Sequence, residues 1–97
     1  MIESFKNKGT EDIFNGVNSR DARSLCPRNL WKITFRKLDQ IDAATDLNDL
    51  RIPPGNRLEA LKGSRKGQHS IRIKEQYRIC FLWNDSGAEE VELVDYH

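Results

Sequence analysis

The stretch 69–83, HSIRIKEQYRICFLW, decides the fold of this chain, because it reads as two strands joined by a tight turn. In the first run the apolar Ile71 and Ile73 alternate with polar neighbours, which is the period of a strand with two different faces. The second run, beginning at Tyr77, is nearly all apolar, as is typical of a central strand covered on both faces. We therefore predict a β-hairpin with its turn at residues 75–76.

Two arginines, Arg72 and Arg78, interrupt these strands. Arginine is rarely buried without an anionic partner. A rigid sheet that presents planar guanidinium groups is suited to bind phosphate. Arginines on a solvent-facing strand also protect a sheet edge from pairing. From the hairpin alone, both interpretations stay open.

The remaining elements follow from turn residues and apolar spacing on either side of the hairpin. Strands gathered behind helices indicate an α+β fold, with helices on one face of a mostly antiparallel sheet of four to five strands. A length of 97 residues suits a single domain, covering 1–97. In chain order we predict a strand at 1–5, a short helix capped by Thr10 and ending near Gly16, a loop or a frayed second helical turn at 17–27, and a long helix at 28–44 entered through Pro27. These are followed by a helical turn at 47–50 capped by Thr45 or Asp46, a strand at 57–62, the hairpin, a tight turn at 84–87 and a last strand at 91–96.

The net charge of +1 conceals a strong asymmetry along the chain. Residues 51–83 carry eight Lys or Arg side chains against two acidic ones, and residues 84–97 carry five acidic side chains and no Lys or Arg. A local basic block fits a polyanionic partner, such as RNA, through phosphate neutralisation. A solvated basic surface without a partner is the competing interpretation.

Composition also bears on the compartment. No window is apolar enough to span a membrane, and the start, MIESFKNKG, lacks the apolar core of a signal peptide. Cys26 and Cys80 lie in different contexts, which favours two reduced thiols over a disulfide or a metal site. The acidic residues show no metal-ligand spacing. We expect a cytoplasmic protein with no metal, no cofactor and no membrane partner.

Cleavage of an RNA phosphodiester needs a base, cations and an acid, and the chain offers all three. Glu59 can accept the proton of a 2′-hydroxyl, and His97 can protonate the departing 5′-oxygen. We expect the nearby Asp95 and the terminal carboxylate to raise the pKa of His97, although a terminal residue is often simply frayed. The cations that would stabilise the phosphate charge are Lys62, Arg72 and Arg78.

Other side chains around the hairpin are candidate RNA contacts. Tyr96, Tyr77 and Trp83 can stack on unpaired bases, although aromatic residues are more often core. His69 is either structural or an RNA contact. The predicted substrate-binding residues are Arg65, Lys66, His69, Lys74, Asp95 and Tyr96.

Taken together, several segments resemble the HigB branch of the RelE/ParE toxin superfamily. They are MI-x-SFK-x-KG at the start, LDQIDAATDLNDL at 38–50, RLEALKG at 57–63, GQHSIRIKEQYRICF at 67–81 and the terminal VDYH. The resemblance implies a RelE-like microbial RNase fold and a toxin of a type II toxin–antitoxin pair. It further implies metal-independent cleavage of translated mRNA in the ribosomal A site, beside 16S rRNA. The implied partner is a HigA-like helix-turn-helix antitoxin, and contact with operator DNA is implied only through the toxin–antitoxin complex.

The resemblance also assigns roles to individual positions. Asp95, Tyr96 and His97 match the terminal motif of the family, so His97 inherits the acid/base role. Arg72 and Arg78 match the hairpin arginines that contact the scissile phosphate, and Lys62 matches the lysine before the hairpin. The chain departs from the HigB pattern at Glu59, where a histidine is usual. Glu59-Ala60-Leu61-Lys62 instead resembles YoeB-like relatives, in which the glutamate is the base.

Two hypotheses from different classes stay open at this point. The first is a ribosome-dependent mRNA endonuclease with Glu59 and His97 as base and acid. The second is a non-catalytic ParE-like inhibitor of DNA gyrase on the same fold. That class lacks the terminal histidine and the glutamate–lysine pair, so their presence favours the endonuclease.

Overall fold

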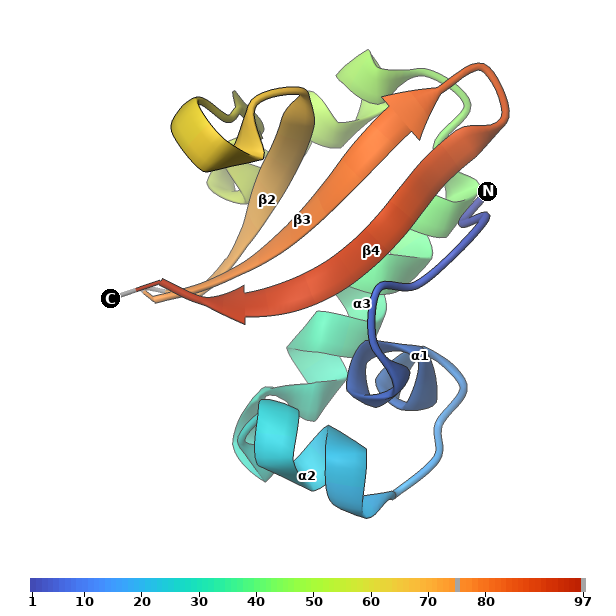
Figure 1. The fold of residues 1–97 in the computed structure, drawn as a ribbon, viewed down its shortest axis with the longest axis vertical. Coiled ribbons are helices and arrows are strands. Elements are labelled where there is room, and N and C mark those ends of the chain that lie inside the picture. The colour runs from blue at the N-terminus through green and yellow to red at the C-terminus, as the bar shows by residue number, and fades with distance from the viewer. Residues whose placement is uncertain (75, 97) are drawn as a thin grey trace.

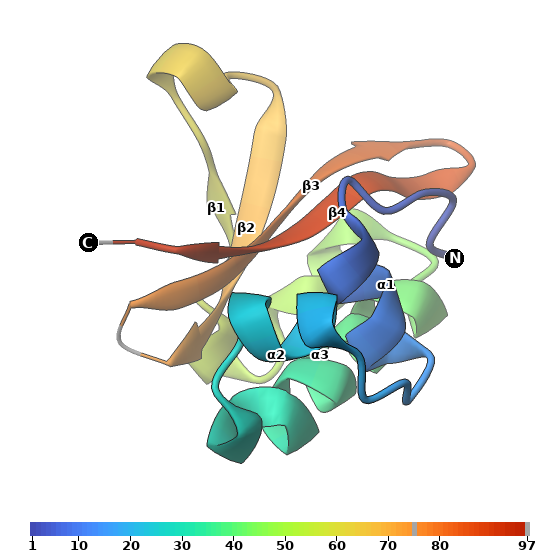
Figure 2. The same cartoon turned by 60° about the horizontal axis from the view of Figure 1, so that its bottom comes forward.

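The computed structural model describes residues 1–74 and 76–96, and it places the helices on one side of a β-sheet (Figures 1 and 2). The arrangement is α+β, as predicted from the order of the elements. In chain order the elements are α1 (Lys8–Phe14), α2 (Arg20–Leu25), the 3-10 helix η1 (Arg28–Leu30), α3 (Trp31–Ala43), the 3-10 helices η2 (Leu47–Arg51) and η3 (Pro54–Asn56), β1 (Glu59–Ala60), the 3-10 helix η4 (Gly63–Arg65), β2 (Gln68–Lys74), β3 (Tyr77–Asn84) and β4 (Gly87–Asp95).

Within the described residues, the strands form a four-stranded antiparallel sheet in the order β1-β2-β3-β4. The predicted hairpin is confirmed, since β2 pairs with β3 and Ile71 lies opposite Ile79. A second hairpin joins β3 to β4, as the turn residues at 84–87 predict. Figure 2 shows α1, α2 and α3 on the same side of this sheet. The opposite face is therefore left open by these helices.

The core lies between the sheet and α3. Ile71, Ile79 and Phe81 of the sheet are fully buried, as are Leu38 and Ile41 of α3. Each such side chain contributes roughly 1.5–3 kcal/mol by leaving water. Alternation along the strands then sends the intervening residues, including both hairpin arginines, to the open face.

The N-terminal segment is not the regular strand that its alternation predicts. It makes two isolated parallel bridges to β4, through Ile2 and Phe5, and Figure 1 shows it running along that strand. The backbone N–H of Leu93 on β4 donates to the hydroxyl of Thr10. The segment thus covers the outer edge of the sheet, which would otherwise expose unpaired backbone groups.

Several predicted boundaries are wrong, for local reasons. Asn7, rather than Thr10, caps α1, because its side chain accepts the Thr10 N–H at 2.9 Å. The predicted loop at 17–27 contains α2, which is capped by Ser19. The long helix begins as a 3-10 turn before α3, and β1 is shorter than predicted at 57–62. Asp46 does cap η2, in a capping box with Asp49.

Alanine at Gly87 is expected to destabilise the protein by about 2–3 kcal/mol. Gly87 has φ +131°, and a Cβ there would lie 2.1 Å from the Met1 carbonyl oxygen, which accepts the Ala88 N–H. The matched control is Gly55→Ala, because a Cβ there meets none of the described atoms within 4 Å. Urea unfolding of both variants is the measurement. Equal losses would show that the Met1 contact does not constrain this turn.

Among the described residues, no helix combines the length and apolarity needed to cross a membrane.

Candidate active site

The open face of the sheet carries a row of side chains, one from each strand. Glu59 of β1 lies opposite Ser70, Ser70 opposite Cys80, and Cys80 opposite Glu92 of β4. Cross-strand partners point to the same face, so these four side chains share it. With neighbouring strands about 4.8 Å apart, the row is about 14 Å long. Ser70 and Cys80 are fully buried and form its floor, and a carboxylate stands at each end.

Arg78 is built into one end of this row. Its Nε donates to the Ser70 hydroxyl at 2.7 Å, and its Nη2 donates to the Arg57 carbonyl at 2.7 Å. Nη2 also lies 3.8 Å from the Glu59 carboxylate, whose side chain is 57% exposed. Arg57 has a left-handed backbone, with φ 45°, and this conformation directs its carbonyl to Arg78. The guanidinium is therefore fixed, while Glu59 stays accessible to a substrate.

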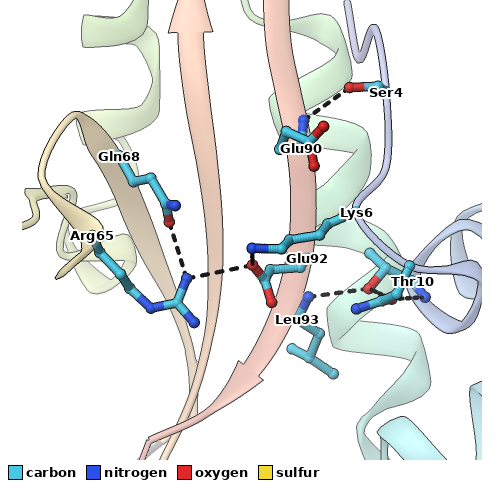
Figure 3. A network of polar contacts seen from close by, with 9 residues as sticks. Ser4, Lys6, Thr10, Arg65, Gln68, Glu90, Glu92 and Leu93 are labelled. Carbon is cyan, nitrogen blue, oxygen red and sulfur yellow. Dashed lines mark hydrogen bonds and ion pairs between the residues drawn. The ribbon is translucent and has the colours of Figure 1, made fainter.

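Arg65 occupies the other end of the row. Its Nη1 donates to the Gln68 side-chain oxygen at 3.0 Å and to Glu92 Oε2 at 3.4 Å. Figure 3 shows Arg65 and Lys6 approaching Glu92 from opposite sides. Lys6 Nζ lies 3.4 Å from the same carboxylate oxygen. Each carboxylate of the row is thus paired with an arginine.

Tyr96 lies over the middle of the row, where its hydroxyl interacts with the Cys80 thiol. Burial, together with Cys80, raises the pKa of Tyr96, and the positive charges of Arg65 and Arg78 oppose that rise. Burial likewise raises the pKa of the Cys80 thiol. Both groups are therefore neutral at physiological pH. Both cysteines are free, which agrees with the reduced thiols predicted from the sequence.

The structure brings some predicted site residues to this face and leaves others apart. Arg72 pairs in register with Arg78, so it lies on the open face, half-buried and without a side-chain partner among the described residues. Lys62 and Lys66 flank η4 and are exposed. Lys74 follows a bulge in β2 and lines a hollow with Pro27 of the helical layer. The alternation that carries Arg72 to the open face therefore does not carry Lys74 there.

His69 lies on the opposite, helix-covered face, next to Ile71 in the alternation. It pairs in register with Phe81, and the two rings lie 6.1 Å apart. The sequence left His69 as either structural or an RNA contact, and this position supports a structural role. Burial lowers the pKa of His69, because the imidazolium form is disfavoured away from water.

This lowered pKa predicts a contribution of His69 to acid sensitivity. As the pH falls below about 6.5, the unfolded chain binds a proton before the folded chain does. The contribution of neutral His69 to stability is complete above that pH and is lost as the pH falls through the folded-state pKa. The free energy of unfolding of His69→Gln should therefore decline less steeply between pH 7 and pH 5. Denaturant unfolding across this range is the measurement, and parallel profiles would contradict the prediction.

Two further predicted site residues belong to the terminal VDYH segment. His97, the predicted acid, lies outside the described residues, as does residue 75 of the predicted turn. Asp95 is exposed, and its carboxylate accepts a hydrogen bond from the Gln76 side chain at 3.1 Å.

Sequence reasoning missed Ser70, Gln68, Arg57 and Glu92 as parts of the site. For Ser70 a signal was available, since it shares the strand alternation of Arg72. Glu92 alternates with Val94 and Tyr96 in the same way. Nothing in the local sequence marks the Arg57 carbonyl as an acceptor for Arg78, because this contact depends on a backbone conformation set by the turn at η3. Among the described residues, no three His, Cys, Asp or Glu side chains gather closely enough to hold a metal ion.

Comparison with known proteins places this geometry in a family. HigB-like toxins, described as the RelE-like toxin of the type II toxin–antitoxin system HigB, match residues 3–97. Toxin HigB-1 of Vibrio cholerae serotype O1 is 45% identical over 89 residues, covering 91% of this chain and 90% of that toxin. Endoribonuclease HigB of Proteus vulgaris is 32% identical over 102 residues, covering 100% of both chains.

A solved structure supports the fold separately. The YoeB–YefM complex from Staphylococcus aureus contains a chain that superposes with a TM-score of 0.61 at 16% identity, covering 100% of this chain and 98% of that one. At this identity the likeness concerns the fold alone. The family match over nearly the whole sequence and the 45% identical relative go further. The chain belongs to the HigB-like toxins, the RelE-like toxins of type II toxin–antitoxin systems.

Proposed function

We propose that this toxin is an endoribonuclease that cleaves translated mRNA in the ribosomal A site and so stops growth. The observation that carries the proposal is the row on the open face, in which the exposed carboxylate of Glu59 lies beside the fixed guanidinium of Arg78. A base next to a preorganised cation is what 2′-hydroxyl attack on a phosphodiester requires. The name of the Proteus vulgaris relative supports the same reaction.

In the proposed reaction, Glu59 accepts the proton of the 2′-hydroxyl while that oxygen attacks the adjacent phosphorus. Arg78 and Arg72 stabilise the charge that develops on the phosphate oxygens. Arg78 needs no reorganisation, since Ser70 and the Arg57 carbonyl already hold it. The bond from phosphorus to the 5′-oxygen then breaks, and His97 supplies the proton to that oxygen. A cyclic 2′,3′-phosphate and a 5′-hydroxyl remain. All of these steps use side chains of the toxin alone.

The other proposed contacts surround this centre. Tyr96 and Arg65 lie above the buried floor and would contact the RNA backbone or an unpaired base. Lys62 and Lys66 are exposed cations beside β1 and β2, suited to phosphates farther along the strand. The proposed partners are the ribosome with its mRNA, a HigA-like antitoxin, and operator DNA through the toxin–antitoxin complex. These partners put the toxin in the bacterial cytoplasm.

A reconstituted translation system tests the proposal. Wild-type toxin should cut a reporter mRNA within codons when ribosomes translate it, and leave the same mRNA intact when ribosomes are omitted. Cleavage of free RNA would remove ribosome dependence while keeping the chemistry. Intact mRNA, together with double-strand DNA breaks in cells that express the toxin, would favour gyrase inhibition instead.

A further inference from the structure

Glu92 is the carboxylate at the end of the row opposite Glu59, on a face that also carries Arg65, Arg72 and Arg78. Its side chain is 13% exposed, and it stands in the row opposite Cys80. Arg65 and Arg78 both act on neighbouring Tyr96, so the carboxylate lies among groups suited to phosphate. A negative charge here repels an RNA backbone. A carboxylate at this position is therefore expected to lower the affinity for RNA, and its role must come from its contacts within the protein.

The contacts of Glu92 indicate what that role is. Its carboxylate accepts a hydrogen bond from Arg65 of η4, the turn that precedes β2. Glu92 itself lies on β4, two strands away from β2, so the contact links two distant parts of the sheet. The other acceptor of Arg65 is the neutral side chain of Gln68. The turn that carries Arg65 is short, with three residues, and none of them is buried. Without the carboxylate, the Arg65 guanidinium keeps a single neutral acceptor and is free to rotate.

We propose that Glu92 is a positioning residue, which holds Arg65 over the row so that its guanidinium meets the RNA phosphate in one orientation. The proposal rests on the endoribonuclease function proposed above. In this arrangement Glu92 weakens the binding of RNA, but it orients the Arg65 guanidinium for cleavage. That combination predicts opposite effects on binding and on rate when the carboxylate is removed.

The test is single-turnover cleavage of mRNA on programmed ribosomes. Glu92→Ala is expected to lower the half-saturating toxin concentration about threefold, because one repulsive charge is gone. The maximal cleavage rate should fall by about tenfold or more, because Arg65 is no longer oriented. Glu92→Gln keeps a hydrogen-bond acceptor and should recover part of the rate. A purely structural role would instead weaken binding and rate together.

Two further variants separate positioning from simple anchoring. Arg65→Gln should slow cleavage in the wild-type background and cause no further loss of rate in the Glu92→Ala background. Lys6→Met is the matched control, since Lys6 pairs with the same oxygen of Glu92 from the other side. It should leave the maximal rate within about twofold. Multiplying losses in the double variant, or a Lys6→Met variant as slow as Glu92→Ala, would overturn the proposal.

A second readout does not depend on cleavage. Nitrogen-15 NMR of the arginine side chains should show slow rotation of the Arg65 guanidinium in the wild type and in Lys6→Met, and fast rotation in Glu92→Ala. If the wild type leaves mRNA intact, the proposed function fails, and this measurement still decides whether Glu92 fixes Arg65. Equal rotation in all three proteins would overturn the positioning role.

Discussion

Replacing Arg78 by lysine is expected to slow mRNA cleavage by about 10²–10³-fold, although the positive charge is kept. The guanidinium uses Nε for the Ser70 hydroxyl and Nη2 for the Arg57 carbonyl. A single ammonium group cannot reproduce this planar fork, so the charge moves away from the position that a phosphate would contact. The buried Ser70 hydroxyl and the Arg57 carbonyl also lose a donor, which should destabilise the protein by about 1–3 kcal/mol. Cleavage on programmed ribosomes and urea unfolding measure the two effects.

The opposite arginine provides the matched control. Arg72 stands across from Arg78 on the same face but makes no side-chain hydrogen bond or ion pair with the described residues. Arg72→Lys therefore removes no protein contact, and it should slow cleavage about tenfold with little change in stability. Equal effects of the two substitutions on stability would show that the contacts of Arg78 contribute nothing to the fold.

Replacing His97 by glutamine is expected to reduce cleavage by about 10²–10⁴-fold, since it removes the proposed proton donor to the 5′-oxygen. Folding and antitoxin binding should be unchanged. The residual activity should lose the decline at high pH that reports deprotonation of His97 in the wild type. Single-turnover rates measured between pH 5 and pH 9 provide the test.

The second histidine of the chain is the control for this variant. His69 lies on the helix-covered face against Phe81, so His69→Gln should keep most of the cleavage activity. Full activity of His97→Gln would remove the acid from the proposed mechanism and direct attention to Tyr96. Loss of activity in His69→Gln at unchanged stability would restore the predicted RNA contact of His69.

Most elements that are formed by residues close in sequence were predicted correctly, and contacts between distant parts of the chain were not. The hairpin, the turn at 84–87 and the cap at Asp46 depend on residues close in sequence, and the structure confirms them. The cap of the first helix was misassigned to Thr10, although Asn7 carries the same chemistry three residues earlier. Thr10 instead accepts the N–H of Leu93, a contact between distant parts of the chain that no local pattern indicates.

The candidate site shows the same division. Alternation along the hairpin was enough to place Arg72 and Arg78 on one face. The selection of Glu59 as the base comes from its chemistry and stays a prediction. The pairing of Glu59 with Arg78 requires the register of β1 on β2, which places Glu59 opposite Ser70. Lys74 shows the limit of alternation, because a bulge in β2 interrupts it.

The sequence by itself determined the α+β class, the central hairpin, the basic character of its surroundings and the presence of the residue types that the proposed RNA cleavage would use. These features depend on periodicity and composition, which can be taken from the sequence without knowledge of the tertiary contacts. Only the tertiary structure decided that Ser70 and the Arg57 carbonyl fix Arg78, that Glu92 holds Arg65, and that His69 faces the core. Strand register and the backbone conformation at Arg57 set these contacts. Both result from packing the whole chain around one core, where burying a polar group without a partner is costly.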